Sequence, residues 1–149
     1  MMIVATNKKA RFEYFIEYTL ETGIELKGSE VKSIRDGGLS LAESFVTIDK
    51  NEVYLKNCYI KPYKNSSSYM PDERRNRKLL LHRSEINKLA TKVKEKGYTL
   101  VAEKVYFKDG KVKVQIALAV GKKLYDKREA LKKNTIKREI EASVNKMFK

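Results

Sequence analysis

The chain has 149 residues and a hydrophobic share of 42%, which is enough for one packed domain and argues against disorder throughout. Its 33 Lys and Arg residues against 19 Asp and Glu residues give a net charge of +14, which favours a polyanionic partner, nucleic acid first. We expect neither a membrane span nor a signal peptide, and a single cysteine, Cys58, indicates a cytoplasmic protein with one buried structural thiol.

The first part of the chain predicts a long strand, a short helix and a hairpin. Over 12–26 apolar residues alternate with polar ones, as in a strand with one buried face, and Gly23 marks a bend. Apolar residues three positions apart before a glycine pair predict a short helix within 28–38. The segment 43–60 predicts two strands joined by the polar turn Asp-Lys-Asn-Glu.

The second part predicts a loop, a helix and another hairpin. Both prolines, a serine run and a basic cluster fall in 61–78, which indicates a long loop. Apolar residues then recur at helical spacing, with Ser84 as the expected N-cap and Gly97 as the expected stop. Two strands, 98–107 and 112–120, are joined through an Asp-Gly pair, which is typical of a tight hairpin.

Three strands, a helix and two further strands is the element order of the five-stranded, partly open barrel that binds oligonucleotides. The sequence therefore predicts a mainly β, OB-fold-like antiparallel barrel with short helices. We assign this body to 1–120 and a basic C-terminal tail to 121–149, where ten basic and four acidic residues give +6. The apolar line Ile136, Ile140 and Val144 is too thin to hold a helix in water, so we expect the free tail to be disordered.

Residues that enzymes and metal sites use are scarce in this chain. His82 is the only histidine, so a Cys–His dyad would rest on Cys58 and His82 alone, and no glycine-rich phosphate loop is present. Glu13, Glu17 and Glu21 fall on the polar face of the first predicted strand, where alternation alone places acids in solvent. We therefore expect a binding protein, not an enzyme, with no catalytic residue, metal or cofactor.

Three basic clusters are candidates for phosphate contacts: Asn7–Arg11, Arg74–Lys78 and the tail. Each alone is commonly a solvated charge run, but three on one strongly basic chain favour a polyanion. Most aromatic residues fit the cores of the predicted strands. Tyr63, Tyr69 and Tyr125 lie in polar surroundings and are better candidates for stacking on bases.

Four stretches, "NKKARFEYFI", "ETGIELKGSEVKSIRDG", "RKLLLH" and "GKKLYDKRE", resemble in order and spacing the signature segments of small protein B, the SsrA-binding protein family of bacteria. The resemblance runs from about Asn7 to Glu129 and continues more loosely to the end. It implies an oligonucleotide-binding barrel, in agreement with the strand order. It also implies binding to the tRNA-like domain of transfer-messenger RNA and its delivery to stalled ribosomes for trans-translation, in which the ribosome is rescued and the incomplete peptide is tagged for degradation.

The resemblance singles out Glu21, Leu80 and Lys113 as contributors to RNA binding, with ordinary barrel structure as the alternative for all three. Lys113, on the polar face of the last strand, would pair with phosphate, and the Glu21 carboxylate would accept from base amino groups. We expect Leu80 to be core or apolar support for the site. The first basic cluster adds three candidate RNA-binding residues, Lys8, Lys9 and Arg11.

For the tail, the resemblance implies that its first part enters the decoding centre of the small ribosomal subunit, while the rest lies as a helix in the empty message channel. The residues expected at the decoding centre are Lys122, Lys123, Tyr125, Asp126, Lys127 and Arg128. Many relatives have histidine where this chain has Tyr125, and the tyrosine preserves stacking but cannot fill a role that needs a charged imidazole. The implied partners are transfer-messenger RNA and the ribosome and, through the RNA, elongation factor Tu and alanyl-tRNA synthetase. The competing classes are a general single-stranded-RNA-binding OB protein and a ribosomal protein with a basic extension.

Overall fold

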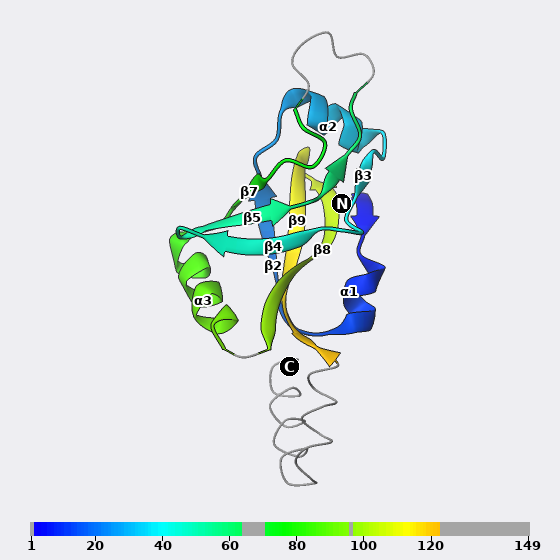
Figure 1. Ribbon diagram of the computed structural model, residues 1–149. Helices are drawn as coiled ribbons and strands as arrows, with labels where there is room; N and C mark the ends of the chain where they lie inside the picture. The colour runs from blue at the N-terminus through cyan, green and yellow to red at the C-terminus, as the bar shows by residue number, and fades with distance from the viewer. Residues whose placement is uncertain (1, 64–70, 96, 123–149) are drawn as a thin grey trace, which may run out of the picture.

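The computed structural model describes residues 2–63, 71–95 and 97–122, and the structural statements below concern these residues (Figure 1). The strands are β1 (Met2–Thr6), β2 (Tyr14–Ile24), β3 (Leu39–Ser40), β4 (Phe45–Asp49), β5 (Glu52–Lys56), β6 (Tyr59–Ile60), β7 (Arg77–Leu80), β8 (Tyr98–Lys108) and β9 (Lys111–Gly121). The helices are α1 (Lys8–Glu13), α2 (Gly28–Arg35) and α3 (Arg83–Val93).

The predicted mainly β, antiparallel barrel is confirmed. Within the described part of the chain, the main sheet has the order β1-β8-β4-β5-β7-β2-β9, and an additional β8–β9 pairing closes it into a ring. Strand β7 lies in this ring between β5 and β2. Strand β1 is not part of the ring and pairs with β8 at Lys104 to Phe107. Neither β7 nor β1 was predicted. Figure 1 shows α2 at one end of the barrel and α1 and α3 on opposite sides of the other end.

Both predicted hairpins are confirmed, and their turns show why the sequence could identify them. The β8–β9 turn places Asp109 at φ 53° and Gly110 at φ 76°. The β4–β5 turn places Lys50 at φ 50° and Asn51 at φ 63°. Two successive residues with positive φ match the right-handed twist of the flanking strands, which is why Asp, Asn and Gly are favoured there.

The barrel interior is apolar and includes the single cysteine. Side chains from β5, β7, β8 and β9 form its fully buried centre, including Val53, Leu55, Leu79, Val105, Val114, Ile116 and Leu118. Cys58 is also fully buried, as expected, and this burial raises the pKa of its thiol to about 11. The thiol is therefore protonated and shielded at neutral pH.

The long first strand predicted over 12–26 is wrong at its start, where the chain forms helix α1. Asn7 caps this helix, because its Oδ1 accepts a hydrogen bond from Ala10 N at 3.3 Å. The Asn7 backbone N–H also donates to Glu103 O of β8 at 2.8 Å, which anchors the cap to the sheet. Phe12, expected on a buried strand face, is consequently 81% exposed.

The three acids expected on one solvated strand face do not share a face. Glu13 ends α1, and a register shift between Ile16 and Tyr18 forms a bulge that buries Glu17. Burial raises the pKa of the Glu17 carboxyl against the opposing effect of nearby Lys92. Of the three acids, Glu21 alone lies on the strand with an accessible side chain.

Three predicted boundaries around helix α3 also shift. Strand β7 begins at Arg77, inside the predicted loop, and residues 64–70 of that loop lie outside the described residues. Helix α3 has His82 as N-cap and not Ser84, because Glu85 Oε1 accepts a hydrogen bond from His82 N at 2.9 Å. The helix ends at Val93, before Gly97.

Candidate nucleic-acid interface

Four neighbouring strands place Tyr106, Lys113, Gly23 and Leu80 in one line across the barrel, which we call the outer row. Tyr106 of β8 pairs with Lys113 of β9, which pairs with Gly23 of β2, which pairs with Leu80 of β7. The neighbouring residues along the same strands are buried in the barrel: Val105, Val114, Thr22 and Leu79. Because successive side chains of a strand point to opposite faces, the outer row faces outward.

Leu80 is 48% exposed, so its predicted core position is wrong. Its neighbour Leu79 occupies the core, and the strand alternation turns Leu80 out. Gly23 lies opposite, where a Cβ atom would come within 3.3 Å of Leu80 Cβ. The glycine thus leaves room for Leu80 to lie over β2, as an apolar contact point on a polar face.

Glu21 precedes Gly23 by two residues and shares its face of β2. The Tyr106 hydroxyl donates to Glu21 Oε2 at 2.5 Å, and Lys108 Nζ lies 3.5 Å from the same oxygen. This hydrogen bond, together with Lys108 and Lys113, lowers the pKa of the Glu21 carboxyl. Burial and the same hydrogen bond raise the pKa of Tyr106. At neutral pH an ionised acceptor is therefore held by a protonated phenol.

Lysines surround this single carboxylate. Lys108 and Lys113 both act on Glu21, and Lys104 Nζ lies 5.9 Å from the centre of the Tyr106 ring. The local charge is thus net positive with one fixed acceptor. Lysines neutralise backbone phosphates, whereas a carboxylate accepts from base amino groups or a ribose 2′-hydroxyl. This combination suits RNA.

Helix α1 covers the other end of the same sheet face. Ala10 packs there against Val101, Ala117 and Ala119, in a small apolar cluster separate from the barrel core. This packing turns the remaining α1 side chains outward: Lys8, Lys9, Arg11, Phe12 and Glu13 are exposed. The helix therefore adds three cations, one carboxylate and one aromatic ring to the edge of the face.

Arg11 is connected to Gln115 of β9 through polar side chains. Its Nη2 lies 3.9 Å from Glu103 Oε1, and the same oxygen accepts a hydrogen bond from Gln115 Nε2 at 2.8 Å. Gln115 in turn pairs with Glu21 across β9 and β2. The candidate residues Arg11 and Glu21 thus belong to one continuous surface.

Sequence reasoning missed Phe12 and Tyr106 as parts of this surface. The signal for Phe12 was Asn7, a helix N-cap residue directly before the basic stretch. Tyr106 carried no comparable signal, since its contact with Glu21 joins residues 85 positions apart.

Three of the four cations in the second basic cluster form ion pairs within the protein, and the predicted phosphate contact is wrong for Arg77. Arg77 is fully buried, and its Nε donates to Glu30 Oε2 at 2.8 Å. Arg75 Nη2 donates to the other carboxylate oxygen of Glu30 at 2.6 Å. Lys78 Nζ lies 3.4 Å from Glu52 Oε2. Arg75 and Arg77 thus hold their segment to α2, and Lys78 joins β7 to β5.

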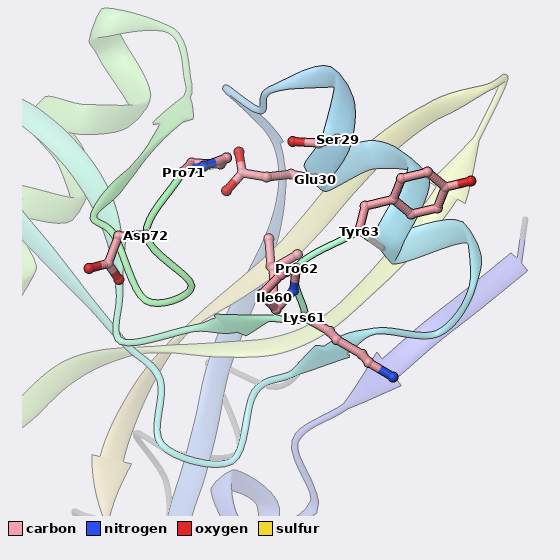
Figure 2. A pocket seen from close by; sticks show the side chains of 8 residues that line it. All are labelled: Ser29, Glu30, Ile60, Lys61, Pro62, Tyr63, Pro71 and Asp72. Carbon is pink, nitrogen blue, oxygen red and sulfur yellow. The ribbon is translucent and has the colours of Figure 1, made fainter. Parts of the chain in front are cut away.

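A hollow beside this cluster is lined by Ser29, Glu30, Ile60, Lys61, Pro62, Tyr63, Pro71 and Asp72. Figure 2 shows Glu30 reaching from α2 toward Pro71, whereas the Lys61 amine points away from it. The Glu30 carboxylate is already engaged by Arg75 and Arg77, so it is not available to a ligand. The ring of Tyr63, a stacking candidate, has Lys32 Nζ 5.8 Å from its centre.

The remaining candidates are only partly described. Lys122 Nζ lies 5.3 Å from the centre of the Phe15 ring, at the end of β9. The other tail candidates and Tyr69 lie outside the described residues: Lys123, Tyr125, Asp126, Lys127 and Arg128. Over 2–63, 71–95 and 97–122, no group of three or more His, Cys, Asp or Glu residues is placed to hold a metal ion. In the same ranges no helix is both long and apolar enough to cross a membrane.

Comparison with known proteins identifies the family. The family model described as SmpB protein matches residues 4–146. An SsrA-binding protein of Sulfurihydrogenibium sp. is 57% identical over 141 residues, covering 95% of this chain and 93% of the relative. One of Caldicellulosiruptor saccharolyticus is 52% identical over 147 residues, covering 99% and 90%. A solved structure described as "tmRNA-SmpB: a journey to the center of the bacterial ribosome" matches with a TM-score of 0.65 and 48% identity, over 78% of this chain and 82% of that one. The chain therefore belongs to the SmpB family, and the resemblance carried by its four sequence motifs is confirmed.

Proposed function

We propose that this protein binds transfer-messenger RNA and delivers it to stalled ribosomes for trans-translation. Its relatives are named SsrA-binding proteins, and the similar solved structure is described as tmRNA-SmpB in the bacterial ribosome. The observation that carries the proposal is the convergence of Glu21, Leu80 and Lys113, distant in sequence, on one exposed and positively charged face.

Each group on this face has a distinct role toward the tRNA-like domain of the RNA. Lys113 and Lys108 pair with backbone phosphates and supply affinity without sequence preference. Glu21 accepts a hydrogen bond from a base amino group or a 2′-hydroxyl. Leu80 packs its exposed side chain against a ribose or base. Lys8, Lys9 and Arg11 extend the phosphate contacts along α1.

The proposal divides the work between a body, 1–120, and a basic tail, 121–149. The described barrel ends with β9 at Gly121, one residue past this division, so the body contains every strand of the RNA-binding face except that last residue of β9. The tail carries +6 and acts at the decoding centre and in the message channel of the small subunit. Elongation factor Tu and alanyl-tRNA synthetase act on the RNA that the protein carries. The protein itself acts by binding, in the cytoplasm, and performs no chemical step.

The test is to purify the protein with its bound RNA from bacterial cells and to sequence that RNA. One dominant transfer-messenger species supports the proposal. Binding spread over many RNAs would favour a general RNA-binding protein, and permanent residence on free small subunits would favour a ribosomal protein.

The site itself is tested with Lys113→Ala and a matched control, Lys94→Ala. Both remove one lysine charge, but Lys94 lies exposed at the end of α3, away from the outer row. Loss of one phosphate contact should reduce the slope of log affinity against log salt concentration by up to about one for Lys113→Ala only. Equal slopes for the two variants would contradict the assignment of the face.

A further inference from the structure

Tyr106 is buried within the face that the RNA is proposed to contact. Its side chain is only 2% exposed, so it offers almost no surface to a ligand. Its hydroxyl nevertheless reaches Glu21 Oε2 at 2.5 Å. The phenol thus touches the proposed binding carboxylate from the protein side and not from the RNA side.

We infer that Tyr106 is a positioning residue for RNA recognition, which holds the Glu21 carboxylate in place so that its Oε1 faces the RNA. This inference rests on the proposed function. Both hydrogen bonds that the carboxylate accepts, from Tyr106 and Lys108, fall on Oε2. Within the described residues, Oε1 is thereby left to accept a hydrogen bond from a base amino group or a 2′-hydroxyl.

The Glu21 carboxylate must be fixed in one orientation if it is to bind RNA without a large entropic cost. A partly exposed glutamate has several rotamers, and ordering it on binding costs conformational entropy. Lys108 is itself about half exposed and flexible, so the ion pair at 3.5 Å does not define one orientation. The hydrogen bond from Tyr106 does define one orientation of the carboxylate, because the phenol ring is buried and cannot change its conformation freely.

The surrounding strands fix the Tyr106 ring. Tyr106 pairs with Lys113 of β9 on one side and with Ile3 of β1 on the other. The Lys104 amine lies over the ring. The unpredicted edge strand β1 therefore has a function under this inference: it pairs with the segment of β8 that carries the phenol and so fixes its backbone.

The same contact extends the ionised form of Glu21 to lower pH. Tyr106, Lys108 and Lys113 face the carboxylate from β8 and β9, and their effects lower its pKa. RNA binding that requires an ionised Glu21 should weaken as the pH falls through this lowered pKa. Removing the Tyr106 hydroxyl should move that acid midpoint to higher pH.

The experiment is a double-mutant cycle with Tyr106→Phe, Glu21→Gln and the double variant, each measured for affinity to the isolated tRNA-like domain. Tyr106→Phe should weaken binding by roughly three- to tenfold, the range expected for one hydrogen bond. In the Glu21→Gln background the same change should have almost no effect, because the group that Tyr106 positions is already gone. A merely structural role would lower affinity equally in both backgrounds, and that result would overturn the inference.

Two further measurements keep the result decisive. The acid midpoint of binding should rise in Tyr106→Phe and be absent in Glu21→Gln, which also controls for protonation of the RNA. Glu21→Asp retains the charge but is one methylene too short to reach the phenol, so it should bind as weakly as Glu21→Gln. This variant changes an accessible side chain and remains informative even if Tyr106→Phe folds poorly. Wild-type affinity for Glu21→Asp would overturn the inference.

Failure of the inference is distinguishable from failure of the proposed function. If Glu21→Gln weakens binding but Tyr106→Phe does not, the site stands and the positioning role is refuted. If neither Glu21→Gln nor Lys113→Ala weakens binding, the face is not the RNA site and both are refuted.

Discussion

Arg77 Nη2 lies 2.6 Å from Glu30 Oε2, and both side chains are buried. Arg77 Nη1 also donates to Cys58 O at 2.7 Å, and the Glu30 carboxylate additionally accepts from Arg75. The pair thus ties α2 to β7 and to the chain that precedes β6. The second basic cluster, proposed from the sequence as an RNA contact, therefore stabilises this end of the barrel.

Arg77→Ala should destabilise the fold by about 3–5 kcal/mol, because it leaves the Glu30 carboxylate buried and incompletely paired. Lys78→Ala is the matched control. Its ion pair with Glu52 is partly exposed and should contribute about 0–1 kcal/mol. Urea unfolding of the two variants measures the difference. Similar midpoints would show that Arg77 is replaceable.

The same network predicts a loss of stability in acid. Burial alone would raise the pKa of Glu30, but hydrogen bonds from Arg75, Lys27 N and Arg77 outweigh it, and the pKa is lowered. The corresponding stability is therefore complete above the unfolded pKa, near 4.5, and is lost as the pH falls through the lower folded value. Urea midpoints measured from neutral pH into acid should decline, and Glu30→Gln should flatten this decline.

Glu17→Gln is the control for this acid effect, because the pKa of Glu17 is raised whereas that of Glu30 is lowered. Burial raises the pKa of Glu17, so its ionised form opposes folding at neutral pH and this cost disappears on protonation. Glu17→Gln should therefore leave neutral-pH stability unchanged or higher. A large loss of stability in this variant would show that the Glu17 charge has a partner that outweighs its burial.

Leu80 and Leu79 provide a matched pair that separates RNA contact from core packing. Leu79→Ala should cost roughly 2–5 kcal/mol of stability, as expected for a buried leucine. Leu80→Ala should leave the melting temperature nearly unchanged, because the side chain is about half exposed. It should instead weaken binding to the tRNA-like domain. The opposite ranking in a thermal melt would restore Leu80 to the core.

The contrast between these leucines shows what could be predicted from sequence. Asp109-Gly110 and the alternating strands beside it are local signals, and both hairpins followed from them. Residues 79–81 are three consecutive leucines without alternation. Their facing is decided by the pairing of β7 with β2, where Gly23 lies opposite Leu80. Gly23 and Leu80 are far apart in the sequence, so no local pattern could predict which leucine faces outward.

The other misses have the same origin. The bulge that buries Glu17 interrupts the period of two at one residue, and nothing in the alternation announces it. Arg77 is buried because Glu30, 47 positions earlier, neutralises it. Glu21 and Lys113 were identified through the family resemblance, whereas residue chemistry alone favoured ordinary strand positions. Local pattern thus predicted the two hairpins and the helices α2 and α3, whereas β1, β7 and the roles of individual side chains depend on long-range pairing.

Phe12→Ala should weaken RNA binding without changing its salt dependence. An aromatic side chain that is 81% exposed among Lys8, Lys9 and Arg11 is placed to stack on an unpaired base, which is a contact without counterion release. Phe12→Tyr retains the ring and should bind normally. Lys9→Ala should instead reduce the salt slope by up to about one. Filter binding over a range of salt concentrations distinguishes these outcomes, and normal affinity for Phe12→Ala would exclude stacking.

The final prediction concerns the tail, most of which lies outside the described residues. If the body binds the RNA and the tail acts on the ribosome, replacing Asp126, Lys127 and Arg128 together by Ala should leave affinity for the isolated tRNA-like domain nearly intact. The same variant should abolish peptide tagging in a reconstituted stalled-ribosome assay, because the decoding centre loses the groups that replace a codon–anticodon pair.

Tyr125 refines this test, since its ring can stack on a base of the decoding centre. Tyr125→Ala should reduce tagging and Tyr125→His should retain it, because histidine preserves a planar ring. Tagging that survives the triple replacement would refute the proposed role of the tail. Loss of binding to the isolated RNA would instead place those three residues within the RNA-binding body, and the division at Gly121 would be wrong.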